Sequence, residues 1–310
     1  MEKARVVAIV QTLSILILMS LGTVITKMAL DNVAPLTFVW VSVAIGMLVL
    51  SIYTFVIRGE RIPRGLGREV WMYIIIIGVF NFVIGRITMT LSLERLPATT
   101  NTYLVNFIGF ITMGMSIFIL KESPTIFQVL GAMIAIVGLR IFFREIPSAY
   151  ELVGVFLILI GITAVAFTNN IARKLAIVTK NSLSNNIVSS VALLIGGSML
   201  VLIGIVVDGV PQVVGWGNWG AIIFAGVTMV ALGLTVWNHI LRTLRSYEAS
   251  ILGASTVIWT ALLAIPILGE TLSVNQIIGM AFMIVGLALV QVRRGHLRSP
   301  FRHQKSVPER

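Results

Sequence analysis

The stretch LGETLSVNQ at residues 268–276, with IVGL at residues 284–287, decides how this chain is organised. A second copy stands at a constant offset of 148 residues (270 − 122), as LKESPTIFQ at residues 120–128 and IVGL at residues 136–139. Without a gap, the same offset relates Trp71 and Trp219, Gly78 and Gly226, Gly85 and Gly233, and Leu104 and Leu252. The chain is therefore an internal duplication.

The composition around these copies is that of a membrane protein. Of the 310 residues, 57% are hydrophobic and only 11% are charged. Soluble domains carry about 25% charged residues because their surfaces face water, and a spanning helix needs about 20 apolar residues. Hydropathy and length predict an all-α membrane protein with ten transmembrane helices, near Val6–Thr26, Ala34–Ile57, Val70–Leu91, Ala98–Leu120, Thr125–Phe142, Leu152–Ala172, Asn185–Val207, Asn218–Leu241, Ala249–Leu268 and Val274–Val292.

The number of spans in each copy predicts the architecture. Five is an odd number, so the second copy enters the membrane upside down and the fold consists of two inverted five-helix repeats. We expect the first repeat at residues 1–146, the second, inverted repeat at 147–293 and a basic tail at 294–310. Inverted repeats recur in secondary transporters, whose substrate site lies near the membrane midplane between the halves.

The basic residues predict the orientation. Of the 23 lysines and arginines, 18 fall at the termini and in the loops of one side, whereas Lys27, Arg86, Arg95, Arg140 and Arg144 fall on the other. Because cytoplasmic loops carry the excess of basic residues, both termini are expected in the cytoplasm of a multi-pass protein of the cell (inner) membrane. The basic tail is expected to lie against anionic lipid head groups, so the net charge of +11 does not indicate a nucleic-acid partner.

Residues that occur in both copies are interpreted as structural. Glu122 and Glu270 precede the last helix of each copy, where the helix dipole favours a carboxylate. Capping boxes at the starts of these helices are predicted from Thr125 with Gln128 and from Ser273 with Gln276. Glycines spaced by seven share one helix face and predict close helix contacts, at positions 78/85, 131/138, 154/161, 226/233 and 279/286.

These motifs resemble the drug/metabolite transporter superfamily, in its ten-helix EamA-type branch. The resemblance rests on LGETL at residues 268–272 with the following Gln276, Gly279 and Gly286, and on the turn SLERLPA at residues 92–98. It implies a helical basket that opens to each side in turn and carries small metabolites. One departure is NFIG at residues 106–109, where family members often have a proline.

Arg86 is the leading candidate for contact with a substrate. Polar residues that occur in only one copy are better site candidates than shared ones, and the repeat partner of Arg86 is Leu234. An arginine at membrane depth costs at least about 2.5–3.5 kcal/mol unless it faces water or a partner. An anionic substrate group is one partner that fits the planar guanidinium, and snorkelling towards the head groups is the alternative.

Further candidates lie on the predicted fourth and ninth spans. Tyr103 and Asn106 share a face of the fourth, and Ser255 and Trp259 share a face of the ninth, so all four are predicted substrate-binding residues. A second set is predicted to form a gate or interhelical hydrogen bonds: Asn169, Asn170, Asn238 and His239.

The pattern as a whole predicts a secondary transporter of small organic metabolites, such as amino acids or organic anions, with export the expected direction. Cation or drug efflux within the same superfamily, a channel and an intramembrane enzyme are the alternatives. The chain has no Gly-x-Ser-x-Gly, His-Glu-x-x-His or phosphate-binding loop motif and no cysteine, so no enzyme, cofactor or metal site is expected. The expected partners are a small-molecule substrate, the lipid bilayer and a coupling proton or counter-substrate, with the chain a monomer or homodimer.

Overall fold

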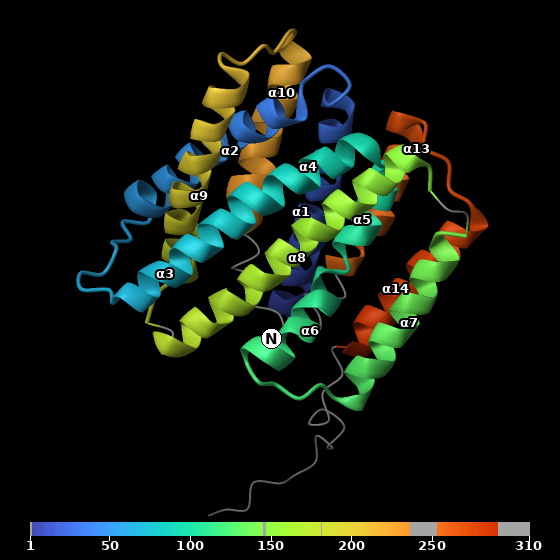
Figure 1. Ribbon diagram of the computed structural model, residues 1–310, viewed down its shortest axis with the longest axis horizontal. Coiled ribbons are helices and arrows are strands. Elements are labelled where there is room, and N and C mark those ends of the chain that lie inside the picture. Colours follow the sequence, from blue (N-terminus) through green and yellow to red (C-terminus); the bar gives the residue numbers. More distant parts are fainter. Residues whose placement is uncertain (1, 145–146, 181, 236–252, 291–310) are drawn as a thin grey trace, which may run out of the picture.

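The computed structural model describes residues 2–144, 147–180, 182–235 and 253–290, which form helices and short connections without a strand. Figure 1 shows long helices packed side by side around one another. The first repeat contains α1 (Glu2–Ala29), α2 (Pro35–Ser51), η1 (Ile52–Ile57), α3 (Arg68–Ile77), η2 (Gly78–Gly85), α4 (Arg86–Arg95), α5 (Ala98–Val105), α6 (Ile108–Ile119) and α7 (Ile126–Phe142). The second contains α8 (Ala149–Val178), α9 (Asn185–Asp208), α10 (Trp216–Phe224), η3 (Ala225–Leu232), α13 (Thr256–Leu268) and α14 (Val274–Val290).

These helices agree with the predicted membrane segments in type and position. Within the described residues, seven are long and apolar enough to cross a bilayer: Val10–Ala29, Pro35–Ile57, Arg68–Arg95, Ala98–Ile119, Ala149–Val178, Asn185–Asp208 and Trp216–Thr235. Three shorter apolar helices accompany them, at Ile126–Phe142, Thr256–Leu268 and Val274–Val290.

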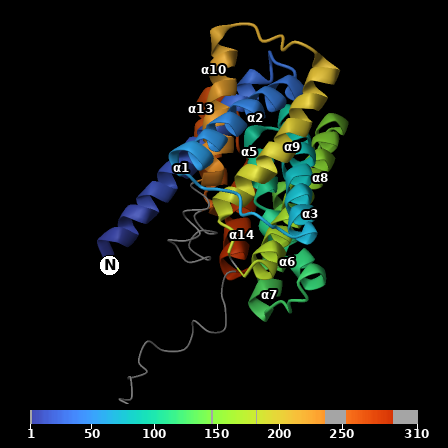
Figure 2. The same ribbon diagram turned by 90° about the vertical axis from the view of Figure 1, so that its left-hand side faces the viewer.

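The connections gather at two opposite ends of the bundle, as Figure 2 shows for the loops around α9 and α10 and those around α6 and α7. We call the first of these the Lys27 end. There Lys27, near the C-terminus of α1, donates to the carbonyl oxygen of Leu93 near the C-terminus of α4, and Thr37 donates to Asp208 at 2.8 Å. At the second, the Glu122 end, Asn186 donates to Glu60 at 2.9 Å. Polar contacts therefore join helix ends at both levels of the bundle.

The last helices of the two copies, α7 and α14, pack through the predicted glycines. A Cβ built on Gly138 would lie 2.9 Å from the carbonyl oxygen of Gly279, and one on Gly279 would lie 2.8 Å from that of Gly138. Gly131 and Gly286 face one another in the same way, so the two helices run antiparallel. These contacts confirm that the glycines form a close helix–helix seam. Both predicted capping boxes are also present, with N–H to side-chain distances of 3.3 Å at Gln128 and Gln276.

Two π-helical segments occupy matching places in the copies. η2 begins at Gly78 and η3 at Ala225, one residue from the position that the offset predicts. A Cβ on Gly78 would meet the carbonyl oxygen of Ala192 on α9 at 2.7 Å, and a Cβ on Gly226 would meet that of Ser42 on α2 at 2.6 Å. Each π-helix therefore packs backbone to backbone against a helix of the other copy.

The fourth predicted span is broken, although the sequence predicted one continuous segment from Ala98 to Leu120. α5 ends at Val105 and α6 starts at Ile108, and the amide of Phe107 donates to the carbonyl of Leu104 at 3.0 Å, which is a tighter turn than an α-helix. Ser255, which precedes α13, has the same backbone angles as Asn106, φ −65° and ψ −13°. α13 therefore begins after a residue with the same backbone geometry, one position from the place that the offset of 148 gives for Asn106.

Candidate functional site

The break between α5 and α6 meets the start of α13 through side chains. The Asn106 amide donates to Thr102 O at 2.9 Å within its own helix and to Thr256 Oγ1 at 3.4 Å across the gap. Ser20 Oγ of α1 donates to the carbonyl oxygen of Thr256 at 3.2 Å. Helices α1 and α5 of the first copy and α13 of the second therefore meet at Thr256. Interrupted helices that meet in this way are a feature of transporter substrate sites.

Ser255 and Trp259 belong to this junction. The indole Nε1 of Trp259 donates to Ser255 Oγ at 3.2 Å, one turn along α13, and both residues are partly exposed. The structure thus brings together three of the predicted substrate-binding residues, Asn106, Ser255 and Trp259. It adds Ser20 and Thr256, which sequence reasoning missed because single hydroxyls in apolar helices carry no distinguishing pattern.

Arg86 lies at the start of α4, directly after η2. Its guanidinium Nη2 donates to the carbonyl oxygen of Met229 in η3 at 3.2 Å, so the side chain crosses from one repeat to the other. No ion pair within the described residues includes Arg86, whereas Arg95 on the same helix pairs with Glu94 at 2.7 Å. A guanidinium has five N–H donors. The Met229 carbonyl oxygen uses one of them, so the Arg86 guanidinium can donate to further acceptors.

Arg86 and the junction at Thr256 lie at the same depth along α1. The Met229 side chain that accompanies Arg86 packs against Gly22, where an added Cβ would meet it at 2.9 Å. Ser20, which contacts the junction, is only two residues away, or about 3 Å along the helix axis. Two residues turn a helix by about 200°, so Arg86 and the junction face opposite sides of α1. Both levels fall near the middle of the span Val10–Ala29.

Tyr103 is not brought to the junction. Its ring stacks on Phe142 with the centroids 3.9 Å apart, its side chain is fully buried, and its hydroxyl donates to the carbonyl oxygen of Gly279 at 3.5 Å. Tyr103 instead packs α5 against α7 and α14.

The polar residues of α8 form interhelical hydrogen bonds. Asn170 is buried and donates to the carbonyl oxygens of Thr112 on α6 at 3.0 Å and of Ala166 at 3.1 Å. Asn169 is exposed and donates to Thr112 Oγ1 at 3.5 Å. The other two residues of this predicted set, Asn238 and His239, lie outside the described residues.

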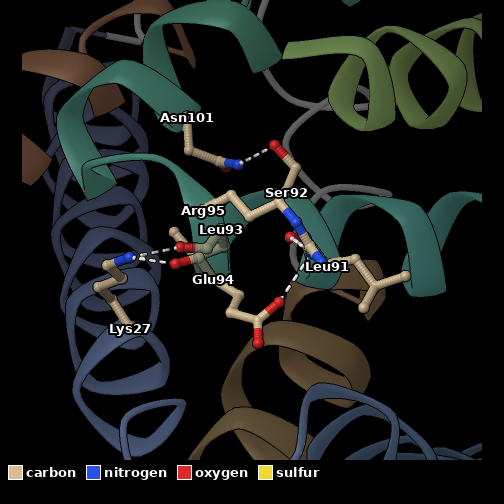
Figure 3. Close-up of polar contacts among 7 residues, drawn as sticks. All are labelled: Lys27, Leu91, Ser92, Leu93, Glu94, Arg95 and Asn101. Carbon is tan, nitrogen blue, oxygen red and sulfur yellow. Dashed lines mark hydrogen bonds and ion pairs between the residues drawn. The ribbon is translucent and has the colours of Figure 1, made fainter. Parts of the chain in front are cut away.

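A further polar cluster surrounds the turn between α4 and α5 (Figure 3). Lys27 Nζ, at the end of α1, donates to the carbonyl oxygens of Leu93 at 2.9 Å and Glu94 at 2.8 Å. From the other copy, the carboxylate of Glu270 accepts the backbone amides of Ala98 and Thr99, the second at 3.2 Å. Glu270 therefore does cap a helix N-terminus, but the helix is α5, and the prediction that it serves the helix that follows it in sequence was wrong.

The residues related to these two by the duplication make different contacts at the Glu122 end. Glu122 pairs with Arg173, with 3.1 Å between Nη1 and Oε2. Lys174, which follows Lys27 by 147 residues and so lies one residue out of step with the offset, has its Nζ 5.6 Å from the ring centroid of Tyr73. A cavity of about 440 Å³ opens beside this pair and is lined by Met113, Ser116, Glu122, Ser123, Pro124, Thr125, Gln128 and Arg173. The two ends of the molecule are thus in different arrangements.

Comparison with known proteins agrees with the two copies. A family model described as the EamA-like transporter family matches residues 6–144 and again residues 152–292. A solved structure described as "Crystal structure of protein" is similar over 93% of this chain and 98% of its own, with a TM-score of 0.63 and 17% sequence identity, which supports the fold alone. No curated protein matches this chain in sequence. With both halves matched, the chain belongs to the EamA-like transporter family, within the drug/metabolite transporter superfamily, and is a multi-pass membrane transporter.

Proposed function

We propose that this transporter is a secondary, alternating-access carrier of small organic metabolites with a carboxylate or similar anionic group, such as amino acids or organic acids. The observation that carries the proposal is the position of Arg86. Its guanidinium reaches across to the carbonyl oxygen of Met229 in η3, at the level of the middle of the candidate span Val10–Ala29. A cation at this depth is costly unless it meets water or an anion.

The chemistry of the guanidinium favours an oxyanion as its ligand. Arginine stays protonated in proteins, and its planar fork forms two parallel hydrogen bonds with a carboxylate. The carbonyl of Met229 orients one nitrogen of the fork and leaves the others available. Asn106, Ser255 and Trp259 lie on the other face of α1, so we place the anionic group at Arg86 and assign these three residues to a separate polar junction on the proposed pathway.

The remaining features of the carrier follow from the duplication and the charge distribution. We place ten spans in two inverted five-helix repeats, at residues 1–146 and 147–293, with both termini and the 294–310 tail on the cytoplasmic side of the cell membrane. The Lys27 end then faces outward and the Glu122 end inward. The proposed direction of transport is export, coupled to a proton or a counter-substrate.

The test combines binding and transport in the purified full-length protein. Amino acids, organic acids, sugars, nucleosides and cationic dyes are screened for thermal stabilisation in detergent, because a ligand at 100 times its Kd stabilises by about 2.7 kcal/mol. Ligands that bind are then followed as labelled substrates in proteoliposomes. We expect hits among the carboxylates, saturable flux and counterflow, which a channel does not give.

Variants of Arg86 then test the site. Arg86→Lys keeps the charge but loses the planar fork, so transport should weaken in part, whereas Arg86→Ala should abolish carboxylate binding in a folded protein. Arg95→Ala is the matched control, because Arg95 lies on the same helix but pairs with Glu94 near the bundle end. Unchanged carboxylate affinity in Arg86→Ala would reject the site. Binding of cationic dyes alone would reject the substrate class.

A further inference from the structure

We propose that Lys27 and Glu270 form a breakable lock that holds the Lys27 end of the transporter closed, and that alternating access requires its release. The lock consists of these two side chains and the backbone of the turn that joins α4 to α5, at residues 93–99. The inference rests on the proposed alternating-access function.

Lys27 holds the first side of this turn. Its ammonium group donates to the carbonyl oxygens of Leu93 and Glu94, which lie in the last turn of α4 (Figure 3). The last carbonyls of a helix lack partners within the helix, and the helix dipole places partial negative charge there. A lysine from another helix is therefore a complementary partner, and it ties the end of α1 to the end of α4.

Glu270 holds the second side of the turn. Its two carboxylate oxygens accept the amides of Ala98 and Thr99, the first residues of α5, which carry the positive end of that helix dipole. Pro97 precedes these residues and starts the helix with no side-chain cap of its own. The N-terminus of α5 thus relies on a carboxylate 172 residues away, in the other repeat.

The lock adds polar contacts between parts that also pack against one another, because α13, which ends just before Glu270, lies against α5 and α1. Lys27 and the turn belong to the first repeat and Glu270 to the second, so the Glu270 contact crosses the boundary between the repeats. Ala98 and Thr99 are buried, which closes the bundle at this level, while Lys27 and Glu270 keep part of their surface in contact with solvent. Hydrogen bonds that water can replace break more readily than the glycine seam between α7 and α14, whose close backbone contact fixes the repeats together.

The other end of the molecule has different contacts at the related positions. Glu122 is the repeat partner of Glu270, and Lys174 lies one residue from the position equivalent to Lys27. Glu122 pairs with Arg173, however, and Lys174 lies over the ring of Tyr73. A cavity opens at that end, lined in part by Met113 and Ser116. The two ends of the molecule therefore differ in their contacts, with the Lys27–turn–Glu270 contacts at one end and a surface cavity at the other.

The experiment measures access from each end in full-length protein without substrate. The native chain has no cysteine, so two single-cysteine reporters can be built. Thr23→Cys lies one helical turn inward from Lys27 on the same face of α1, and Met113→Cys lines the cavity at the Glu122 end. Each reporter is combined with Lys27→Met, Lys27→Arg, Glu270→Gln or Glu122→Gln, and the rate of maleimide labelling is measured.

Release of the lock should move the two reporters in opposite directions. We expect Lys27→Met and Glu270→Gln to raise the labelling rate of the Thr23→Cys reporter by about tenfold, a usual size for coupling between two conformations, and to lower that of the Met113→Cys reporter. Lys27→Arg keeps a cationic donor and should leave the rates near those of the parent. Glu122→Gln is the matched control at the other end and should not raise labelling at the Thr23→Cys reporter.

Other outcomes would overturn the proposal. Unchanged labelling at the Thr23→Cys reporter in both release variants would show that the contacts do not limit access. Faster labelling at both reporters, or loss of folded protein for Lys27→Met and Glu270→Gln alike, would assign the contacts to folding. Because no ligand is present, the result is independent of the Arg86 tests, so either proposal can fail while the other stands.

Discussion

Gly131 and Gly286 lie backbone against backbone, and a Cβ added to either would stand 2.5 Å from the carbonyl oxygen of the other. Each is the sequence partner of a glycine in the opposite helix, since the offset of 148 relates Gly131 to Gly279 and Gly138 to Gly286. The same kind of contact is therefore made twice between α7 and α14, by Gly131 with Gly286 and by Gly138 with Gly279. Association in a bilayer depends on such close packing because lipid offers no hydrophobic driving force between helices.

Filling this seam should destabilise the transporter. Gly138→Leu and Gly286→Leu place a side chain where backbone atoms of the facing helix already lie, and overpacking of this kind costs about 1–3 kcal/mol. We expect lower yields of folded protein and lower melting temperatures in detergent. Gly114→Leu is the control, because no atom lies within 4 Å of an added Cβ at Gly114. Equal yield and melting for all three variants would contradict the role of the seam.

The orientation of the bundle can be tested with single cysteines. Pro63 and Thr271 are exposed at the two opposite ends, and Val210, at the same end as Thr271, is 83% exposed. If the basic side is cytoplasmic, an impermeant maleimide should label Val210→Cys and Thr271→Cys in intact cells and should label Pro63→Cys and Ser299→Cys only after lysis. Ser299 lies outside the described residues, and its labelling tests the predicted cytoplasmic tail. The reverse pattern would invert the topology.

The two neighbouring asparagines of α8 should differ in their effect on stability. Asn170→Ala removes two hydrogen bonds, one of which joins α8 to α6, and leaves the carbonyl of Thr112 without this donor. Hydrogen bonds between membrane helices contribute about 0.6 kcal/mol on average and at most about 1.7 kcal/mol, so a small but measurable fall in melting temperature is expected. Asn169→Ala, at an exposed site with a 3.5 Å contact, should change little. An equal fall for both would contradict this assignment.

The contact between the α5–α6 break and the start of α13 should be visible as a coupling energy. Asn106→Ala and Thr256→Val each remove one side of the 3.4 Å contact. In a double-mutant cycle the two changes should be less than additive by about 0.6 kcal/mol, the average for such bonds. Asn106→Ala combined with Ser273→Ala, a change in the capping box of α14, should be additive. Additivity in both cycles would mean that the two segments do not support one another.

Sequence reasoning reached the features that depend on local composition and on spacing along one helix. The apolar segments, both capping boxes and the glycine seams are of this kind, because a cap needs residues three apart and a seam needs small residues on one helix face. The choice of Arg86 as a candidate site residue followed from comparing the two copies and stays a prediction. The break at Asn106 was missed, because no proline or glycine stands at that point to mark it.

What the sequence alone determined is a duplicated bundle of apolar helices, since hydrophobic length, charge placement and internal similarity are all present in one dimension. Tertiary structure decided which groups meet. Glu270 caps α5 rather than the helix beside it in the chain, Tyr103 packs against Phe142, and the α5–α6 break meets the start of α13 at Thr256. These choices depend on the three-dimensional approach of segments more than 30 residues apart in the chain, and no pattern within a single helix encodes which distant group will satisfy a free backbone amide or carbonyl.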